Sequence, residues 1–135
     1  MKKKFNILIA DKNKNVRDFL RRELGAEGYE VSTARDGDQV LREIDGEKPP
    51  DLLILDLEIP DMDGTKVLEK TRKRNPPLPV IVHTFLTEES ERDGQGQTEI
   101  YIEKSGNIDH LKSAITEILG RFYPETAPET SPETP

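Results

Sequence analysis

The chain has 135 residues, of which 33% are apolar and 35% charged, and its formal net charge is −7. This length fits one domain, the absence of cysteine excludes disulfides and thiolate chemistry, and the acidic balance argues against a general nucleic-acid binder. No apolar run reaches the roughly 18 residues of a membrane span and the N-terminal run is too short for a secretory signal, so we expect a cytoplasmic location.

The first half of the chain alternates short apolar runs with segments of helical periodicity. Residues 5–10 are a strand candidate, and residues 29–34 alternate as a second strand. Between them, apolar residues recur at helical spacing, namely Val16, Phe19, Leu20 and Leu24. Gly25 and Gly28 follow and are expected to end this helix. Asp36 is a candidate N-cap for a second helix, which carries Val40, Leu41 and Ile44.

The second half repeats the pattern. Residues 49–60 contain a continuous apolar run, as expected for a strand buried on both faces. The turn Asp-Met-Asp-Gly then leads into a helix with Val67 and Leu68. Residues 79–84 and 99–102 are two further strand candidates, and Asn107 is placed to cap a last helix. Strands that alternate with helices predict βαβ units, a parallel sheet and right-handed crossovers.

Two segments depart from this alternation. Residues 85–99 lie where a fourth helix is expected, but beyond Phe85 and Leu86 they offer no apolar residue before the next strand, so we predict a short, frayed or absent helix. Residues 124–135 repeat Pro-Glu-Thr and cannot bury enough apolar surface to offset the entropy of ordering. We therefore predict a folded domain over residues 1–123, followed by a disordered tail.

Polar side chains follow four of the predicted strands. They are Asp11, Asp56, Thr84 and Lys104. Taken singly, an aspartate suits a turn, a threonine suits a strand, and a lysine suits the surface. In open parallel sheets, however, sites form outside the carboxyl ends of the strands. We therefore expect two acids, a hydroxyl and an ammonium around one crevice.

The segment "DLLILDLEIPDMDG", with "GYEVSTARDG", "PVIVHT" and "YIEK" in matching order and spacing, resembles the receiver domain of bacterial response regulators in two-component phosphorelays. The resemblance covers residues 4–122. It implies a doubly wound, flavodoxin-like α/β fold with a five-stranded parallel sheet in the order 2-1-3-4-5. It also implies a role in phosphorelay signal transduction without enzymatic turnover.

The resemblance assigns roles to six residues. Asp56 would be the phosphoacceptor, Thr84 would bind a phosphoryl oxygen, and Lys104 would pair with the phosphoryl charge. Thr84 and the aromatic Tyr101 would form the switch that reports phosphorylation. Asp11, Asp56 and the backbone carbonyl of the residue two positions later, Glu58, would hold Mg²⁺.

Lys12 departs from the family pattern, because members usually carry a second acid directly after the first. Two unit charges ~4 Å apart interact by about 4 kcal/mol at an effective dielectric constant of ~20, so a lysine here is expected to weaken Mg²⁺ binding tenfold or more. We expect the ammonium to replace the metal against Asp56 and Glu58, which leaves Mg²⁺ weak or absent. The alternative is that Lys12 turns into solvent and Asp11 still holds a weakened metal.

Two further departures lie at the strand ends. Phe85 follows Thr84, where the family usually has a small residue, and either crowds the pocket or fills space beside a weak fourth helix. Ser105 follows Lys104, where the family usually has proline, so the loop is expected to be set differently. His83, one residue before Thr84, is expected to be packed.

Two readings within the family stay open. We favour a degenerate receiver that acts as a protein-interaction module, and the alternative is a conventional phosphorylatable receiver. A haloacid-dehalogenase-like phosphatase is a distant alternative, because it needs an acid where Asn13 stands, and a dinucleotide-binding domain needs glycines that "DKNKNV" lacks. The expected partners are a sensor kinase or a downstream signalling protein, with no nucleic acid or membrane, and we expect a monomer.

Overall fold

The computed structural model describes residues 4–61, 63–85, 99–104 and 107–124. In chain order the elements are β1 (Asn6–Ala10), α1 (Lys14–Ala26), β2 (Glu30–Ala34), α2 (Gly37–Ile44), β3 (Leu52–Leu55), α3 (Gly64–Lys73), β4 (Val80–Thr84), β5 (Glu99–Glu103) and α5 (Ile108–Phe122). None of the described helices has both the length and the apolar character needed to cross a lipid bilayer.

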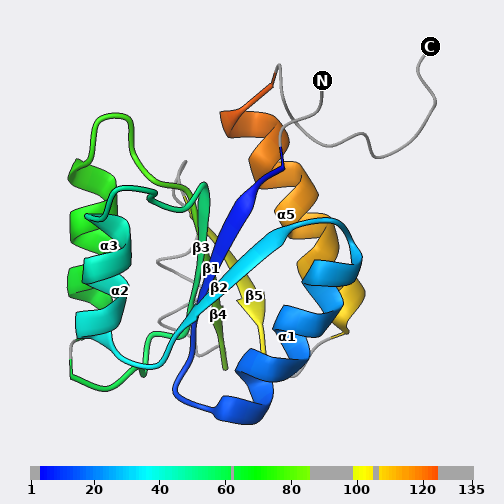
Figure 1. The fold of residues 1–135 in the computed structure, drawn as a ribbon, viewed down its shortest axis with the longest axis horizontal. Helices are drawn as coiled ribbons and strands as arrows, with labels where there is room; N and C mark the ends of the chain where they lie inside the picture. Colours follow the sequence, from blue (N-terminus) through cyan, green and yellow to red (C-terminus); the bar gives the residue numbers. More distant parts are fainter. Residues whose placement is uncertain (1–3, 62, 86–98, 105–106, 125–135) are drawn as a thin grey trace.

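The strands form one parallel sheet in the order β2-β1-β3-β4-β5, which confirms the predicted doubly wound topology. Helices α2 and α3 cover one face of the sheet, and α1 and α5 cover the other (Figure 1). The pairing of β1 with β3 keeps Ala10 opposite Leu55. Because these are the last residues of their strands, the residues that follow both strands emerge side by side.

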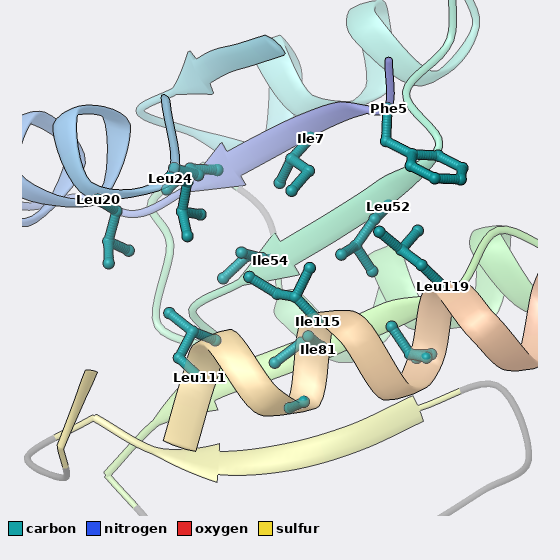
Figure 2. Close-up of a cluster of buried hydrophobic side chains, with 13 residues drawn as sticks. Phe5, Ile7, Leu20, Leu24, Leu52, Ile54, Ile81, Leu111, Ile115 and Leu119 are labelled. Atoms are coloured by element: carbon teal, nitrogen blue, oxygen red, sulfur yellow. The ribbon is translucent and has the colours of Figure 1, made fainter. Parts of the chain in front are cut away.

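Two apolar clusters fill the spaces between the sheet and its helices. Alternate residues of β1 serve the two clusters: Ile7 and Ile9 face α1 and α5, and Leu8 and Ala10 face α2 and α3. Figure 2 shows the cluster on the α5 side, where Ile115 lies among side chains from the central strands. Burial on both faces explains why the central strands appear in the sequence as unbroken apolar runs.

Local capping explains where the helices begin. The Asp36 side chain accepts a hydrogen bond from the amide of Gln39, and the Asn107 side chain accepts one from the amide of Asp109, as predicted for both caps. The prediction for the end of α1 was wrong in one respect, because Gly25 lies inside the helix. The chain turns instead at Gly28, whose φ of 99° is a conformation that glycine adopts without steric cost.

Three predictions fall outside the described residues. They concern the fourth helix beyond Phe85, the conformation of the loop at Ser105, and the tail beyond Pro124.

Candidate functional site

Three strand ends bring charged side chains to one edge of the sheet. Asp11 follows β1, Asp56 follows β3 and Lys104 follows β5. The backbone continues the strand pairing for one more step, because the amide of Asp56 donates to the carbonyl of Ala10 at 2.9 Å. In the same way the amide of Lys104 donates to the carbonyl of Thr84 at 2.8 Å. The sheet itself therefore positions these side chains.

Lys104 joins the two carboxylates. Its Nζ lies 2.8 Å from Oδ2 of Asp11 and 2.7 Å from Oδ2 of Asp56. Both aspartate side chains are 3% exposed and the lysine side chain is 11% exposed, so the cluster is largely shielded from water. Burial lowers the pKa of Lys104, but the hydrogen bonds and charges of both aspartates outweigh burial and hold the pKa above its ordinary value. The protonated Lys104 thus forms ion pairs with both buried carboxylates.

The other oxygen of each carboxylate is used by the local turn. Oδ1 of Asp11 accepts a hydrogen bond from the amide of Asn13 at 2.8 Å, and Oδ1 of Asp56 accepts one from the amide of Glu58 at 3.0 Å. Arg17 adds a bond from its Nη1 to the backbone carbonyl of Asp11, at 2.8 Å. Each side chain is therefore anchored by its own turn and directs its remaining oxygen at Lys104.

Lys12 lies at the outer rim of the same edge. Its Nζ is 3.2 Å from Oε1 of Glu58, and the two side chains are 49% and 69% exposed. The expected contact with Glu58 is therefore present. The expected contact between Lys12 and Asp56 is absent. Within the described residues, the ammonium beside Asp56 belongs to Lys104. The sequence interpretation gave both positions to one lysine, whereas Lys12 extends along the exposed rim and Lys104 occupies the buried centre.

The residues at the end of β4 differ sharply in exposure. Thr84 is buried at 6% exposure, close to Lys104 through the backbone bond described above. Phe85 is 62% exposed, and its ring centroid lies 5.9 Å from Nζ of Lys104. The ring therefore stands at the margin of the cluster, on the side of the ammonium, and is not packed into the core.

His83 is packed, as predicted, at 8% exposure. Its Nδ1 has no hydrogen-bond partner among the described residues. Burial lowers the pKa of His83, and the nearby charge of Lys104 lowers it further. The imidazole is consequently held neutral behind the ionic cluster.

Tyr101 lies on β5 and is half-buried against the apolar cluster that faces α2 and α3. Its position beside β4 follows from the pairing of Val82 with Tyr101. The switch role of Tyr101 and Thr84 stays a prediction.

Sequence reasoning missed the importance of Gly64. A Cβ atom at this first residue of α3 would lie 2.7 Å from both Cα and O of Leu57, which is closer than real Cβ contacts come. Only glycine fits, so the N-terminus of α3 packs directly onto the loop that follows Asp56. The turn sequence "DMDG" carried the signal, since it ends in this glycine.

The resemblance implies a Mg²⁺ ion at these carboxylates. Mg²⁺ takes six oxygen ligands in nearly octahedral geometry. The free oxygens of Asp11 and Asp56 both contact the ammonium of Lys104, and Lys12 stands where a second acid would add a ligand. Asp11 and Asp56 are therefore the side chains that would hold the ion here, and each of them now contacts an ammonium.

A cavity of about 250 Å³ opens beside the cluster, between α1 and α5. Its lining is mostly apolar and comprises Val16, Phe19, Leu20, His83, Ile102, Glu103, Lys104, Asn107, Ile108 and Leu111. Phe19 is 40% exposed at this cavity. The helical spacing of Val16, Phe19 and Leu20 had predicted one apolar face of α1, but not that part of this face would stay open.

Comparisons with known proteins agree with this geometry. The sequence profile of the response regulator receiver domain matches residues 7–116. The response regulator MprA of Mycobacterium bovis is 34% identical over 126 residues, which cover 92% of this chain and 54% of MprA. The chain thus spans about half the length of the curated relatives it matches.

Two solved structures of one Thermotoga maritima protein are also similar. The response regulator TrrA of Thermotoga maritima, in complex with Mg²⁺ and BeF, has a TM-score of 0.73 at 34% identity and covers 88% of this chain and 100% of its own. TrrA in complex with the histidine kinase ThkA has a TM-score of 0.70 at 32% identity, covering 88% and 99%.

Proposed function

The chain belongs to the response regulator receiver domain family of two-component signalling, and from that premise we propose that Asp56 is its phosphoacceptor, with Mg²⁺-dependent phosphorylation impaired by Lys12. The domain then acts chiefly as a cytoplasmic protein-interaction module. One observation carries the proposal: the ammonium of Lys104 bridges Asp11 and Asp56, while a second lysine stands where the metal-binding acid belongs.

The acceptor chemistry follows from the position of Asp56. Its Oδ2 attacks phosphorus and forms an acyl phosphate, while the bond from phosphorus to the donor breaks and its electron pair leaves with the donor group. Three phosphoryl oxygens then need positive charge and hydrogen-bond donors. In this proposal Lys104 moves its ammonium from the carboxylate to one of these oxygens, and the hydroxyl of Thr84 donates to another. The 2.7 Å contact between Lys104 and Asp56 supports the first role, and the position of Thr84 at the end of β4 supports the second.

The impairment follows from charge. Lys12 replaces a ligand with a cation at the rim of the site, and its contact with Glu58 places the ammonium near the backbone segment that would supply a metal ligand. Removing one carboxylate ligand and adding a positive charge is expected to cost about 1.4 kcal/mol or more of Mg²⁺ binding, which is a tenfold weaker affinity.

A labelling experiment tests the proposal. The domain is incubated with Mg²⁺ and a small acyl phosphate, and the mass gain of one phosphoryl group is followed in wild type, Lys12→Asp and Asp56→Asn. We expect slow, incomplete labelling of wild type, at least tenfold faster labelling of Lys12→Asp, and none in Asp56→Asn. Isothermal titration should show that Lys12→Asp binds Mg²⁺ more tightly than wild type does.

Fast stoichiometric labelling of wild type would support the conventional receiver instead. Equal Mg²⁺ affinity in wild type and Lys12→Asp would show that the lysine does not control the metal. Phe85→Ala in the Lys12→Asp background separates the charge effect from access, because its ring stands beside Lys104.

A histidine kinase is the partner that we propose for this site. TrrA forms a complex with such a kinase, and here the partly exposed Phe19 and the apolar cavity lie at the same edge as Asp56. A donor histidine has to approach this edge to reach the acceptor. Phe19→Glu should therefore abolish co-purification with the kinase while leaving labelling by the small donor unchanged.

A further inference from the structure

A groove between α2 and α3 is unusually rich in cations. The two helices lie side by side on one face of the sheet (Figure 1). The groove has a volume of about 260 Å³ and is lined by Leu41, Ile44, Asp45, Lys70, Lys73 and Arg74. It lies where both helices end, at the opposite edge of the sheet from the ionic cluster. Nothing in the proposed function uses it.

The cations of this groove form no ion pair among the described residues, whereas several cations on other helices do; Arg21 and Arg22 of α1 resemble the groove cations in this respect. On α1, Lys14 pairs with Asp18, on α2 Arg42 pairs with Asp38, and on α5 Arg121 pairs with Glu117. Among the described residues, no ion pair involves the three cations that line the groove, namely Lys70, Lys73 and Arg74. The lining thus holds three cations and one acid, Asp45, and this local positive excess on a chain of net charge −7 favours an acidic occupant.

We propose that residues 125–135 of the same chain occupy this groove. This segment carries Glu125, Glu129 and Glu133 and has no cation, so its charge complements the groove. Its prolines favour an extended backbone with little conformational entropy to lose on binding. The apolar side chains of Leu41 and Ile44 offer a surface for those prolines.

The last described residues of the chain lie at the same edge of the sheet as the groove, so residues 125–135 begin near it. The hydroxyl of Tyr123 donates to the backbone carbonyl of Asp51, just before β3, at 2.8 Å. Burial and the charge of Asp51 raise the pKa of Tyr123 to about 12, and the guanidinium of Arg74 opposes that rise. The charge of Arg74 therefore acts on the hydroxyl of Tyr123, which indicates that the two side chains lie near each other.

The length of the segment is sufficient. Residues 125–135 in an extended polyproline conformation span about 34 Å, at roughly 3.1 Å per residue. The segment has to pass from the face covered by α5 to the face covered by α2 and α3, which is two interlayer distances of roughly 10 Å each. A short tether also keeps the local concentration of the segment in the millimolar range, so weak ion pairs suffice for measurable occupancy.

Paramagnetic relaxation enhancement tests the proposal in the full chain. The sequence has no cysteine, so Ser131→Cys gives a single site for a nitroxide label. At low salt we expect at least a twofold loss of amide signal at Leu41, Ile44 and Lys70, relative to the reduced label. The loss should disappear in 1 M NaCl, where the Debye length is about 3 Å.

A matched pair of charge reversals makes the test specific. Lys70→Glu with Lys73→Glu should restore the amide signals of α2, whereas Arg21→Glu with Arg22→Glu, an equal charge change on exposed residues of α1, should leave the loss in place. No loss at the groove, or equal loss in both variants, would overturn the proposal. A loss that grows with protein concentration would assign the groove to the segment of a second copy and would equally contradict it.

Discussion

The two edges of the sheet treat charge in opposite ways. At the carboxyl edge, two buried carboxylates converge on the one ammonium of Lys104, with both contacts at or below 2.8 Å. At the other edge, the groove between α2 and α3 gathers Lys70, Lys73 and Arg74 without an ion pair among the described residues. The difference reflects burial: a carboxylate shielded from water is costly without a cationic partner, whereas the groove cations can be hydrated or can bind a ligand.

Replacing the central lysine should have the largest effect. Lys104→Met leaves Asp11 and Asp56 buried without their cation, and we expect a loss of about 3 kcal/mol in the free energy of unfolding at pH 7. Lys70→Met, the matched change in the groove, should stay within about 0.5 kcal/mol of wild type. Urea denaturation monitored by circular dichroism measures both.

The double variant Lys104→Met/Asp56→Asn should recover part of the loss, because it removes one of the two unpaired charges. If the single variants at positions 104 and 70 were equally stable, the contrast between the two edges would be wrong.

Acidification should give an intermediate effect through His83. Because burial and Lys104 lower its pKa in the folded state, the unfolded chain takes up a proton first as the pH falls below about 6.5. Stability should therefore fall as the pH decreases from 7 to 5. His83→Leu should abolish this component, and it should also stabilise the protein at pH 7 because no polar atom is left unpaired.

His110→Gln is the control for this titration, since His110 is exposed on α5. This variant should keep the pH dependence of wild type. A pH dependence that survives in His83→Leu but vanishes in His110→Gln would show that the buried imidazole is not its source.

Lys12 should give the smallest effect on stability, although it lies at the same edge as Lys104. Its ion pair with Glu58 is exposed, and exposed pairs contribute roughly 0–1 kcal/mol. Lys12→Met should therefore change the free energy of unfolding by about 0.5 kcal/mol or less in the same urea titration. A loss as large as that of Lys104→Met would mean that burial does not separate the two lysines.

Much of the architecture was predictable because it rests on local periodicity. Apolar runs of strand length, with helical spacing between them, predicted the parallel sheet, and Asp36 and Asn107 were identifiable as caps from residue type alone. The same reasoning placed Asp11 and Asp56 together, because neighbouring parallel strands end at one edge.

The partner of each charge was harder to predict. Lys12 and Lys104 both follow strands, and only the path of each side chain decides which one reaches Asp56. The basic groove was likewise invisible, because Leu41 and Lys70 are distant in sequence and meet only when α2 and α3 pack on the same face. Gly25 shows the limit of residue preference, since α1 continues past it to Ala26.

The order of synthesis gives Lys104 one more consequence. Lys104 lies 48 residues after Asp56. At about 5–20 residues per second, the ribosome therefore adds Lys104 roughly 2–10 s after Asp56. During that interval the emerging strands carry two carboxylates and no counter-ion, which disfavours early closure of the sheet. Completion of the native state is thereby tied to the arrival of the last strand.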